Sequence, residues 1–362
     1  MKRILLFLLI ILPWLGLGQS TMLHWYLPKL SLDKVQNLSQ YDGIIVDPDV
    51  IYNDRESLDQ LRKLNPDIII MSYFNPAEFF DPMFDDKPWG LKIAGILKDK
   101  EAWWLKDSQG QRVGLWPGMY TLDCSLDCPK YYVDGAMKNY ITFITDRFIA
   151  DVLEQYPFDG VLIDNVWDSI GWIGNHVRSQ AGLDRDNDGL KDDKAAIDGS
   201  WYQGMESCLK KLRHYDPGLT LICNPASLSY SKSCDGKMFE HFPDKYVDET
   251  DSCSEAWYAN MNVAFTMAQS HDWGFNILNS REDNYFFTLA SAMLLDQAFF
   301  SYKQNTPYEK RWELGLGKAK GEAKSLENGN MFRRQYENGA VYVAPLQKKA
   351  WIEYLNGQRR DN

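Results

Sequence analysis

Residues 158–165 read Phe-Asp-Gly-Val-Leu-Ile-Asp-Asn: an Asp-Gly pair, three apolar residues and then the acid Asp164. An apolar, β-branched run between two turn-forming ends is typical of a strand buried in a parallel sheet. A carboxylate that ends such a strand lies beside low-dielectric walls, where an unpaired charge is costly. Stability alone favours Val or Ile at this position. Asp164 is therefore a candidate for chemistry rather than for packing.

The same pattern recurs along the chain as an internal repeat. Its copies are residues 42–47, 159–164, 235–240 and, in a degenerate form, 296–301. They fall on the second, fourth, sixth and eighth of eight expected strands, and alternate strands of a (β/α)8 barrel share an interior layer. The repeat thus predicts Asp47, Asp164 and Glu240 at equivalent heights at the C-terminal strand ends, where barrel enzymes build their active sites. The alternative for each acid is that it caps a loop or pairs with an arginine.

Short β-branched runs alternate with helical patterns, as in a succession of βαβ units. The expected strands are 23–27, 43–46, 68–73, 160–164, 219–223, 237–241, 274–278 and 298–301. The expected helices are 31–39, 55–64, 131–155, 201–215, 255–270 and 285–295. This α/β alternation favours a closed (β/α)8 TIM barrel over an open doubly wound sheet. We place the barrel in residues 19–305. A small C-terminal β-appendage without catalytic content is expected in 306–362, where Asn338-Gly339 predicts a hairpin.

The N-terminus carries an export pattern. Lys2 and Arg3 precede an apolar run over 4–12 and the small-residue stretch 16–18. This layout predicts a signal peptide in residues 1–18, cleaved near Gly18, and the run is short for a membrane span. An uncleaved N-terminal anchor is the alternative. We therefore expect a secreted or periplasmic protein with no membrane attachment after cleavage, and a monomer.

Charge and motifs disfavour several classes of partner. The formal net charge is −11 and the chain has no basic stripe, which argues against nucleic acid as a partner. No GxGxxG or P-loop motif occurs, so we expect no organic cofactor. The six cysteines lie in the exported part and permit disulfides. The favoured pairs are Cys234–Cys253 and Cys124–Cys128, from loop-like stretches, whereas Cys208 and Cys223 are expected in the core.

Residues 184–193 read Asp-Arg-Asp-Asn-Asp-Gly-Leu-Lys-Asp-Asp. Acids at alternate positions with glycine at the sixth are what a Ca²⁺ loop needs, because the side chains converge on one ion and glycine allows the sharp turn. The bidentate Glu of a full EF-hand is missing, since position twelve is Ala195. We therefore expect a partial, structural Ca²⁺ loop beside the active site, with a solvated acidic loop as the alternative. Its predicted ligands are Asp184, Asp186, Asp188, Leu190 and Asp192.

The stretch 158–165 resembles the "FDGxxxDN" strand of the hypothetical glycoside-hydrolase-like family 15. That family is similar to the endo-α-1,4-polygalactosaminidase barrels of glycoside hydrolase family 114. Further blocks agree in order, and the resemblance covers nearly the whole mature chain. They are residues 72–78, 116–123, 235–240, 313–318 and 332–339. The resemblance implies a TIM barrel in which Asp164 is the nucleophile or base and Glu240 the general acid. The family's hairpin continues into a "vvNP" strand, whereas this chain has Val343-Ala344-Pro345.

These observations together predict a secreted glycoside hydrolase that cleaves a poly- or oligosaccharide with two carboxylates, one ionised and one held protonated. Asp47 is expected to bind substrate or to tune the pKa values of the pair. Further substrate contacts are expected at strand ends, from Trp25, Tyr73, Trp167, Asp168 and Asn224. One alternative is a carbohydrate-binding barrel that has lost catalysis. Another is a metal-dependent hydrolase such as a deacetylase, which five histidines without suitable spacing disfavour.

Overall fold

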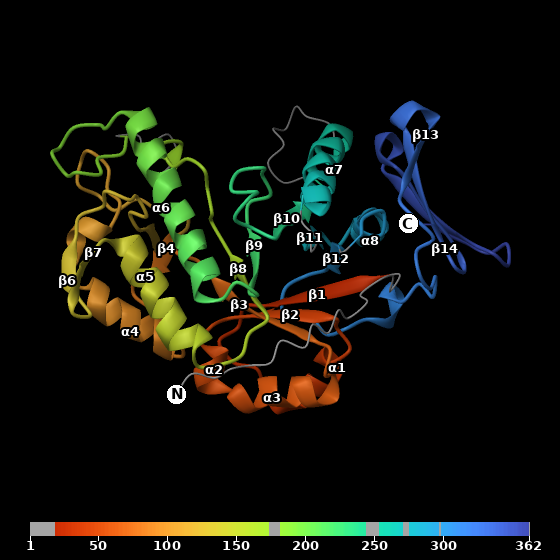
Figure 1. Ribbon diagram of the computed structural model, residues 1–362, viewed down its shortest axis with the longest axis horizontal. Helices are drawn as coiled ribbons and strands as arrows, with labels where there is room; N and C mark the ends of the chain where they lie inside the picture. The colour runs from red at the N-terminus through yellow and green to blue at the C-terminus, as the bar shows by residue number, and fades with distance from the viewer. Residues whose placement is uncertain (1–18, 174–181, 244–252, 271–274, 297, 362) are drawn as a thin grey trace.

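A computed structural model describes residues 19–173, 182–243, 253–270, 275–296 and 298–361, so the predicted signal peptide lies outside the described residues. Eight parallel strands close into a barrel (Figure 1), in the order β1-β12-β11-β10-β9-β8-β3-β2. They are β1 (Ser20–Trp25), β2 (Gly43–Val46), β3 (Ile69–Phe74), β8 (Gly160–Ile163), β9 (Thr220–Cys223), β10 (Gly236–Phe242), β11 (Asn276–Ser280) and β12 (Ala298–Ser301). The predicted TIM barrel is confirmed, and every predicted strand overlaps one of these.

Helices connect most of the barrel strands and cover the outside of the barrel (Figure 1). They are α1 (Leu32–Leu38), α2 (Val50–Asn53), α3 (Arg55–Leu64), α4 (Pro88–Leu97), α5 (Tyr140–Phe148), α6 (Lys194–Tyr215), α7 (Cys253–Ser270) and α8 (Tyr285–Ala292). A π-helical turn, Ile149–Leu153, continues α5. The connection from β9 to β10, residues 224–235, is described in full and contains no helix. Among the described helices, none is both long enough and apolar enough to cross a bilayer.

The predicted helix over 131–155 is wrong in its first third. Residues 131–138 form a hairpin of β6 (Tyr131–Val133) and β7 (Ala136–Lys138). Its turn is Asp134-Gly135, and both residues have positive φ, 52° and 78°. Two central residues in this conformation suit a tight hairpin, for which Asp-Gly is a preferred pair. The helix therefore begins only after Asn139, whose side chain accepts a hydrogen bond from the Thr142 amide.

The internal repeat has a structural basis in its Asp-Gly pairs. Each aspartate accepts a hydrogen bond from a backbone N–H of the neighbouring strand; the pairs are Asp42 with Thr21, Asp159 with Ile70, and Asp235 with Leu221, each at 2.7 Å. The glycines leave room inside the base of the barrel. A Cβ on Gly236 would lie 1.5 Å from the Phe275 carbonyl oxygen, and one on Gly160 would lie 2.5 Å from the Met71 side chain. The repeat thus fixes strand register and packing at the base of the barrel.

The barrel interior is apolar in its middle and polar at the C-terminal ends of the strands. One apolar side chain from each strand fills the middle, namely Met22, Ile45, Met71, Leu162, Ile222, Met238, Ile277 and Phe299. Two residues further along, on the same side of each strand, comes a polar residue. We call these eight residues the polar ring: His24, Asp47, Tyr73, Asp164, Asn224, Glu240, Asn279 and Ser301. The polar ring lies at the C-terminal strand ends, above a closed apolar plug.

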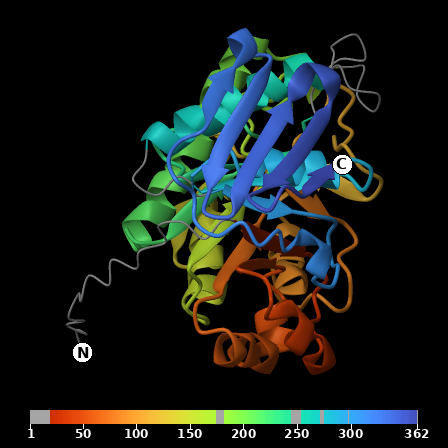
Figure 2. The same cartoon turned by 90° about the vertical axis from the view of Figure 1, so that its right-hand side faces the viewer.

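The C-terminal appendage is larger than the predicted hairpin. It is a five-stranded antiparallel sheet of β13 (Lys324–Leu326), β14 (Met331–Tyr336), β15 (Gly339–Ala344), β16 (Lys349–Tyr354) and β17 (Arg359–Asp361). Tyr336 pairs with Gly339, so the loop of the central hairpin is Glu337-Asn338 and Gly339 already belongs to β15. The sheet lies against α7 and α8 (Figure 2). Its buried Arg334 forms an ion pair with Asp296, the aspartate of the degenerate repeat.

Candidate active site

Asp164 follows β8 directly and receives three hydrogen bonds. The Tyr73 hydroxyl, from β3, donates to Oδ2 at 2.6 Å. On the other oxygen, Asn224 Nδ2 donates to Oδ1 at 2.7 Å and the Asn165 backbone N–H donates at 2.9 Å. Donors from the strands on both sides of β8 therefore hold the carboxylate in one orientation at the mouth of the barrel.

Asn224 also links Asp164 to the second acid. Its Nδ2 lies 3.5 Å from Glu240 Oε2, so one amide group is within hydrogen-bond reach of both carboxylates. Asn224 follows β9, which lies between β8 and β10 in the barrel. The structure thus brings together Asp164, Glu240, Tyr73 and Asn224. The next residue, His241, has a φ of 53° and an exposed side chain, so it does not belong to the polar ring.

A group of aromatic rings extends the site on the side of Asp164 where Tyr73 lies. The Tyr73 ring centroid lies 4.7 Å from that of Tyr26, and His24 stacks on Tyr26 at 5.6 Å. Burial, together with the negative charge of Asp164, raises the pKa of both tyrosines well above the ordinary value, so each keeps its proton. Burial lowers the pKa of His24 to about 3, which keeps that ring neutral. Tyr26 and His24 were not predicted, although alternation from Met22 along β1 points both side chains inward.

A third acid, the buried Glu78, lies close to Asp164. It opens β4 (Glu78–Phe80), which pairs with β5 (Met119–Thr121) in a ribbon inserted after β3. Its Oε2 accepts a hydrogen bond from Asn165 Nδ2 at 2.8 Å. Burial, and next the charge of Asp164, raises the pKa of Glu78 to about 7. The sequence interpretation included this residue only as the end of the block 72–78 and assigned it no role.

Asp47 lies at its predicted place in the polar ring, but its charge is compensated locally. It forms an ion pair with Lys87 and accepts a hydrogen bond from the Asp49 amide at 2.9 Å. Among the contacts of the described residues, none joins Asp47 to Asp164 or Glu240. This environment corresponds to the alternative of a paired, loop-capping acid, with a lysine in place of the expected arginine.

Two tryptophans that were predicted to contact substrate are buried. Trp25 is 2% exposed, its indole N–H donates to the Lys29 carbonyl, and the Lys34 ammonium lies 4.8 Å from its ring centre. Trp167 is 9% exposed and packs against Trp172. Trp25 alternates with His24 and therefore faces the surrounding helices instead of the barrel interior. Both indoles therefore pack in the core of this structure. The prediction failed because a position at a strand end does not by itself place a side chain at the barrel mouth.

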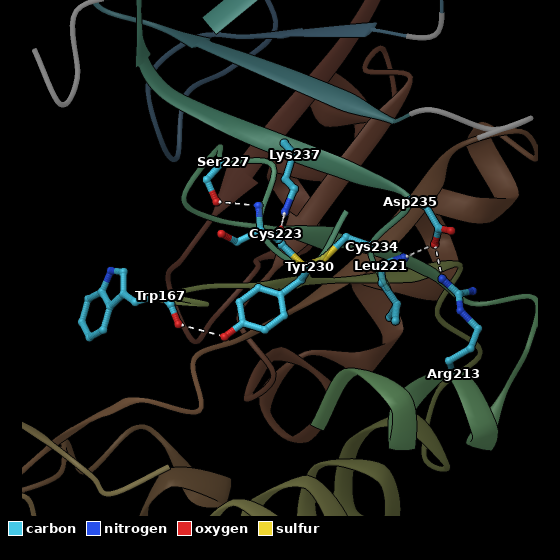
Figure 3. Close-up of a disulfide and its surroundings, with 10 residues drawn as sticks. Trp167, Arg213, Leu221, Cys223, Ser227, Tyr230, Cys234, Asp235 and Lys237 are labelled. Carbon is cyan, nitrogen blue, oxygen red and sulfur yellow. Dashed lines mark hydrogen bonds and ion pairs between the residues drawn. A yellow bond between two sulfur atoms is a disulfide. The ribbon is translucent and has the colours of Figure 1, made fainter. Parts of the chain in front are cut away.

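The loop that carries Asn224 is closed by a disulfide (Figure 3). Cys223 and Cys234 are bonded, with their Cα atoms 6.2 Å apart. Lys237 Nζ donates to the Ser229 carbonyl at 2.7 Å, and the Tyr230 hydroxyl donates to the Trp167 carbonyl at 3.2 Å. These contacts hold residues 224–235, which we call the clamped loop.

The predicted disulfides are therefore wrong. Cys234 pairs with Cys223, and Cys124 and Cys128 are free and buried. Because a short loop without a helix joins the adjacent strands β9 and β10, Cys223 at the end of β9 and Cys234 near the end of the clamped loop lie within the Cα separation that a disulfide requires. Cys208 is a buried free thiol, as predicted.

The acidic loop 184–193 brings three carboxylates together. Ligand oxygens of Asp184, Asp186 and Asp188 all lie within 4.8 Å of one another. Gly189, with a φ of 84°, makes the turn that the pattern requires. The carboxylate of Asp192 accepts a hydrogen bond from the Arg185 amide at 2.6 Å and is not part of this group. Leu190 donates its backbone N–H to Asp188 at 2.7 Å.

The fold and the site define a class of protein: a (β/α)8 barrel with a pair of carboxylates at the C-terminal strand ends, as in glycoside hydrolase barrels. Residues 62–340 match the family described as hypothetical glycosyl hydrolase family 15. Because this match covers more than half of the chain, the protein belongs to that family. It is accordingly a glycoside hydrolase-type barrel, for which family and fold imply a carbohydrate substrate. No curated protein matches the chain significantly.

Solved glycosidase barrels share the fold at low identity. The glycoside hydrolase domain of PelA from Pseudomonas aeruginosa is 13% identical with a TM-score of 0.49, over 78% of this chain and 94% of that chain. A family 36 α-galactosidase from Geobacillus stearothermophilus is 8% identical with a TM-score of 0.51, over 92% and 47%. A maltogenic α-amylase from Thermotoga neapolitana is 7% identical with a TM-score of 0.49, over 95% and 94%. At 8% identity, the likeness to the α-galactosidase is one of fold alone.

Proposed function

We propose that the protein is an exported glycoside hydrolase that cleaves a poly- or oligosaccharide with Asp164 and Glu240. The observation that carries this proposal is the Asn224 amide within reach of both carboxylates, at 2.7 and 3.5 Å. Glu240 acts as the general acid and protonates the glycosidic oxygen as the bond to the anomeric carbon breaks. Asp164, oriented by Tyr73 and Asn224, acts on the anomeric carbon as nucleophile or through a water as base.

The spacing of the two acids favours retention of configuration. Retaining enzymes separate their carboxyl groups by about 5–5.5 Å and inverting enzymes by about 6.5–9.5 Å. Because Asp164 Oδ1 and Glu240 Oε2 both contact Asn224 Nδ2, these two facing oxygens lie no further apart than the two contacts of 2.7 and 3.5 Å placed end to end. This limit applies to the facing oxygens and not to the carboxyl groups as wholes, and it is compatible with the shorter, retaining separation. We propose that Asp164 is the nucleophile of a double displacement, and the close approach of the facing oxygens of Asp164 and Glu240 supports this role.

The test is activity of Asp164→Asn and Glu240→Gln on a panel of amino-sugar and neutral polysaccharides, followed by release of reducing ends. We expect each variant to lose at least about 1000-fold in kcat, since each removes a reacting group. Glu353→Gln, on the C-terminal sheet, is the control and should retain full activity. Full activity in either site variant would sink the assignment. Binding of a glycan by wild type without release of reducing ends would instead identify a barrel that has lost catalysis.

We also propose that the acidic loop binds Ca²⁺ in a structural role. The convergence of Asp184, Asp186 and Asp188 supports this proposal, as does the attachment of the loop through the Asp184 amide to the Lys106 carbonyl at 2.9 Å. Calcium at 100 times its Kd would stabilise the fold by about 2.7 kcal/mol. The measurement is thermal unfolding with EDTA, Ca²⁺ or Mg²⁺. A calcium-specific rise in Tm that Asp184→Asn abolishes is expected, and an equal Tm in all three conditions would contradict the site.

Export is the remaining part of the proposal. The basic residues, apolar run and small residues of 1–18 support a cleaved signal and a secreted or periplasmic location. N-terminal sequencing of the protein recovered outside the cytoplasm tests it, with a mature terminus near Gln19 expected. A recovered chain that still begins at Met1 would favour the anchor.

A further inference from the structure

The ribbon inserted after β3 delivers Glu78 to the side of the catalytic acid. The turn that starts the ribbon is fixed by Asn75, whose Oδ1 accepts the backbone N–H groups of Ala77 and Glu78 at 3.0 and 3.1 Å. Pairing of β4 with β5 fixes the residues that follow. Glu78 is 6% exposed as a result. A carboxyl group buried in this way needs partners, because its desolvation is otherwise costly.

The principal partner of Glu78 is the residue that follows the catalytic acid. Glu78 Oε2 accepts from Asn165 Nδ2 at 2.8 Å, and the Asn165 backbone N–H donates to Asp164 Oδ1 at 2.9 Å. Asn165 has a φ of 55°, a left-handed conformation that non-glycine residues adopt at some cost and that asparagine tolerates best. A hydrogen bond to the Asn165 side chain stabilises this conformation. Glu78, Asn165 and Asp164 thus form one continuous chain of contacts.

The surroundings of the second oxygen of Glu78, Oε1, favour the protonated, neutral form of this carboxyl group. Glu78 Oε1 is buried and has no hydrogen-bond partner among the described residues, although the nearby Leu115 backbone N–H opposes the rise in the pKa of this carboxyl group. The described ion pairs also include none with Glu78. Ionisation here would place a second, poorly solvated negative charge near Asp164, which is why burial and the Asp164 charge raise the pKa of Glu78 to about 7. A neutral Glu78 can accept from Asn165 without repelling the Asp164 carboxylate.

We propose that Glu78 is a positioning residue of the active site, which acts through Asn165 to hold the Asp164 carboxylate in its reactive orientation. Glu78 itself transfers no proton to substrate. The effect of Glu78 on kcat rests on the hydrolase function proposed above. The electrostatic coupling of Glu78 to Asp164 does not depend on that function.

Three variants separate positioning from charge. Glu78→Gln keeps the size and the acceptor oxygen, so kcat should stay within about threefold of wild type. Glu78→Ala and Asn165→Ala remove the contact, and kcat should fall roughly 10- to 100-fold with KM changed less than about twofold, since small displacements of a reacting group have effects of this size. The kcat of the double variant Glu78→Ala/Asn165→Ala should be no lower than that of the slower single variant, because both substitutions remove the same contact. Glu101→Gln, in the same insertion, is the control.

Wild-type kcat in Glu78→Ala would overturn the proposal. Equal damage from Glu78→Gln and Glu78→Ala would also overturn it, because the proton or the charge of Glu78 would then be required. Thermal unfolding of each variant identifies any that fail to fold. Glu78→Gln remains informative even if the alanine variant does not fold, since loss of kcat in a folded glutamine variant contradicts positioning.

A readout without activity distinguishes this inference from the hydrolase proposal. In ¹³C NMR of the carboxyl carbons, one glutamate should titrate near pH 7 in wild type and lose that signal in Glu78→Gln. Asp164→Asn should move the titration to lower pH, because the neighbouring negative charge is gone. An unchanged midpoint in Asp164→Asn would refute the coupling. Absence of hydrolysis on every glycan would refute only the proposed function.

Discussion

Removal of the Cys223–Cys234 disulfide should both destabilise the protein and slow catalysis. The bond closes a loop with a sequence separation of 11. In the chain-entropy model, a loop of this length accounts for about 3 kcal/mol of stability. The unfolding entropy of the roughly 340 residues that follow the predicted signal peptide, at about 2.1 cal/mol/K per residue, converts this into a fall in Tm of about 4 °C. The contacts of Lys237 and Tyr230 remain, so the clamped loop is loosened and not released.

The catalytic effect follows from the position of Asn224, which directly follows Cys223 and holds Asp164 at 2.7 Å. Loosening the clamped loop weakens a hydrogen bond to a charged group, and such bonds contribute about 1.5–3 kcal/mol. We expect kcat to fall roughly 10-fold, less than in Asn224→Ala, which removes the amide altogether.

The assay compares wild type and Cys223→Ala/Cys234→Ala, each with and without a reductant, by thermal unfolding and by kcat. Reductant should bring wild type to the level of the double variant and leave the double variant unchanged. Mass spectrometry of the trapped thiols establishes the redox state. If reduced wild type keeps its Tm and kcat, the disulfide does not hold the clamped loop and the reasoning is refuted. If the reductant also affects the double variant, its effect does not come from the Cys223–Cys234 bond.

Three further predictions concern the hydrogen bond to Asp164, the stereochemistry and the pH dependence. Tyr73→Phe should lower kcat roughly 10- to 100-fold, because it deletes a hydrogen bond of about 1.5–3 kcal/mol to the reacting carboxylate, and an unchanged kcat would contradict that contact. The first product should keep the anomeric configuration of the substrate in ¹H NMR, and an inverted first product would disprove the double displacement. The pKa values of Asp49 and Glu78 are raised to about 7, chiefly by burial, so their contribution to stability is present at low pH and is lost as pH rises through about 7. Tm should therefore rise as pH falls from 8 to 6, with a smaller rise in Glu78→Gln; an identical slope in that variant would argue against the shift.

The barrel could be predicted because each strand has a short apolar or β-branched core and alternates with a helical pattern, and the Asp-Gly repeat indicated which strands are alternate. The convergence of Asp164, Glu240, Tyr73 and Asn224 follows from the same register. The hairpin at 131–138 was missed because its strands are only three residues long and precede a genuine helix. A turn signal, Asp134-Gly135, was present.

The remaining differences depend on contacts between segments distant in the sequence. Glu78 reaches Asn165 only because the ribbon of β4 and β5 brings residues from two different connections together, and no local pattern predicts that contact. Cys223 and Cys234 meet because a helix is missing between two strands. The orientation of Trp25, by contrast, could have been read from its alternation with Met22 and His24 along β1.

The polar ring has an evolutionary consequence. Each strand contributes one polar side chain two residues beyond the side chain that seals the barrel, so the residues that close the fold and those that form the polar ring are separate sets. A mutation in the polar ring can therefore change what the barrel recognises while the apolar plug keeps the scaffold closed. Outside the proposed catalytic pair, Asp164 and Glu240, the polar ring therefore offers a lineage single-step routes to new specificity, and an engineer a defined set of sites to vary.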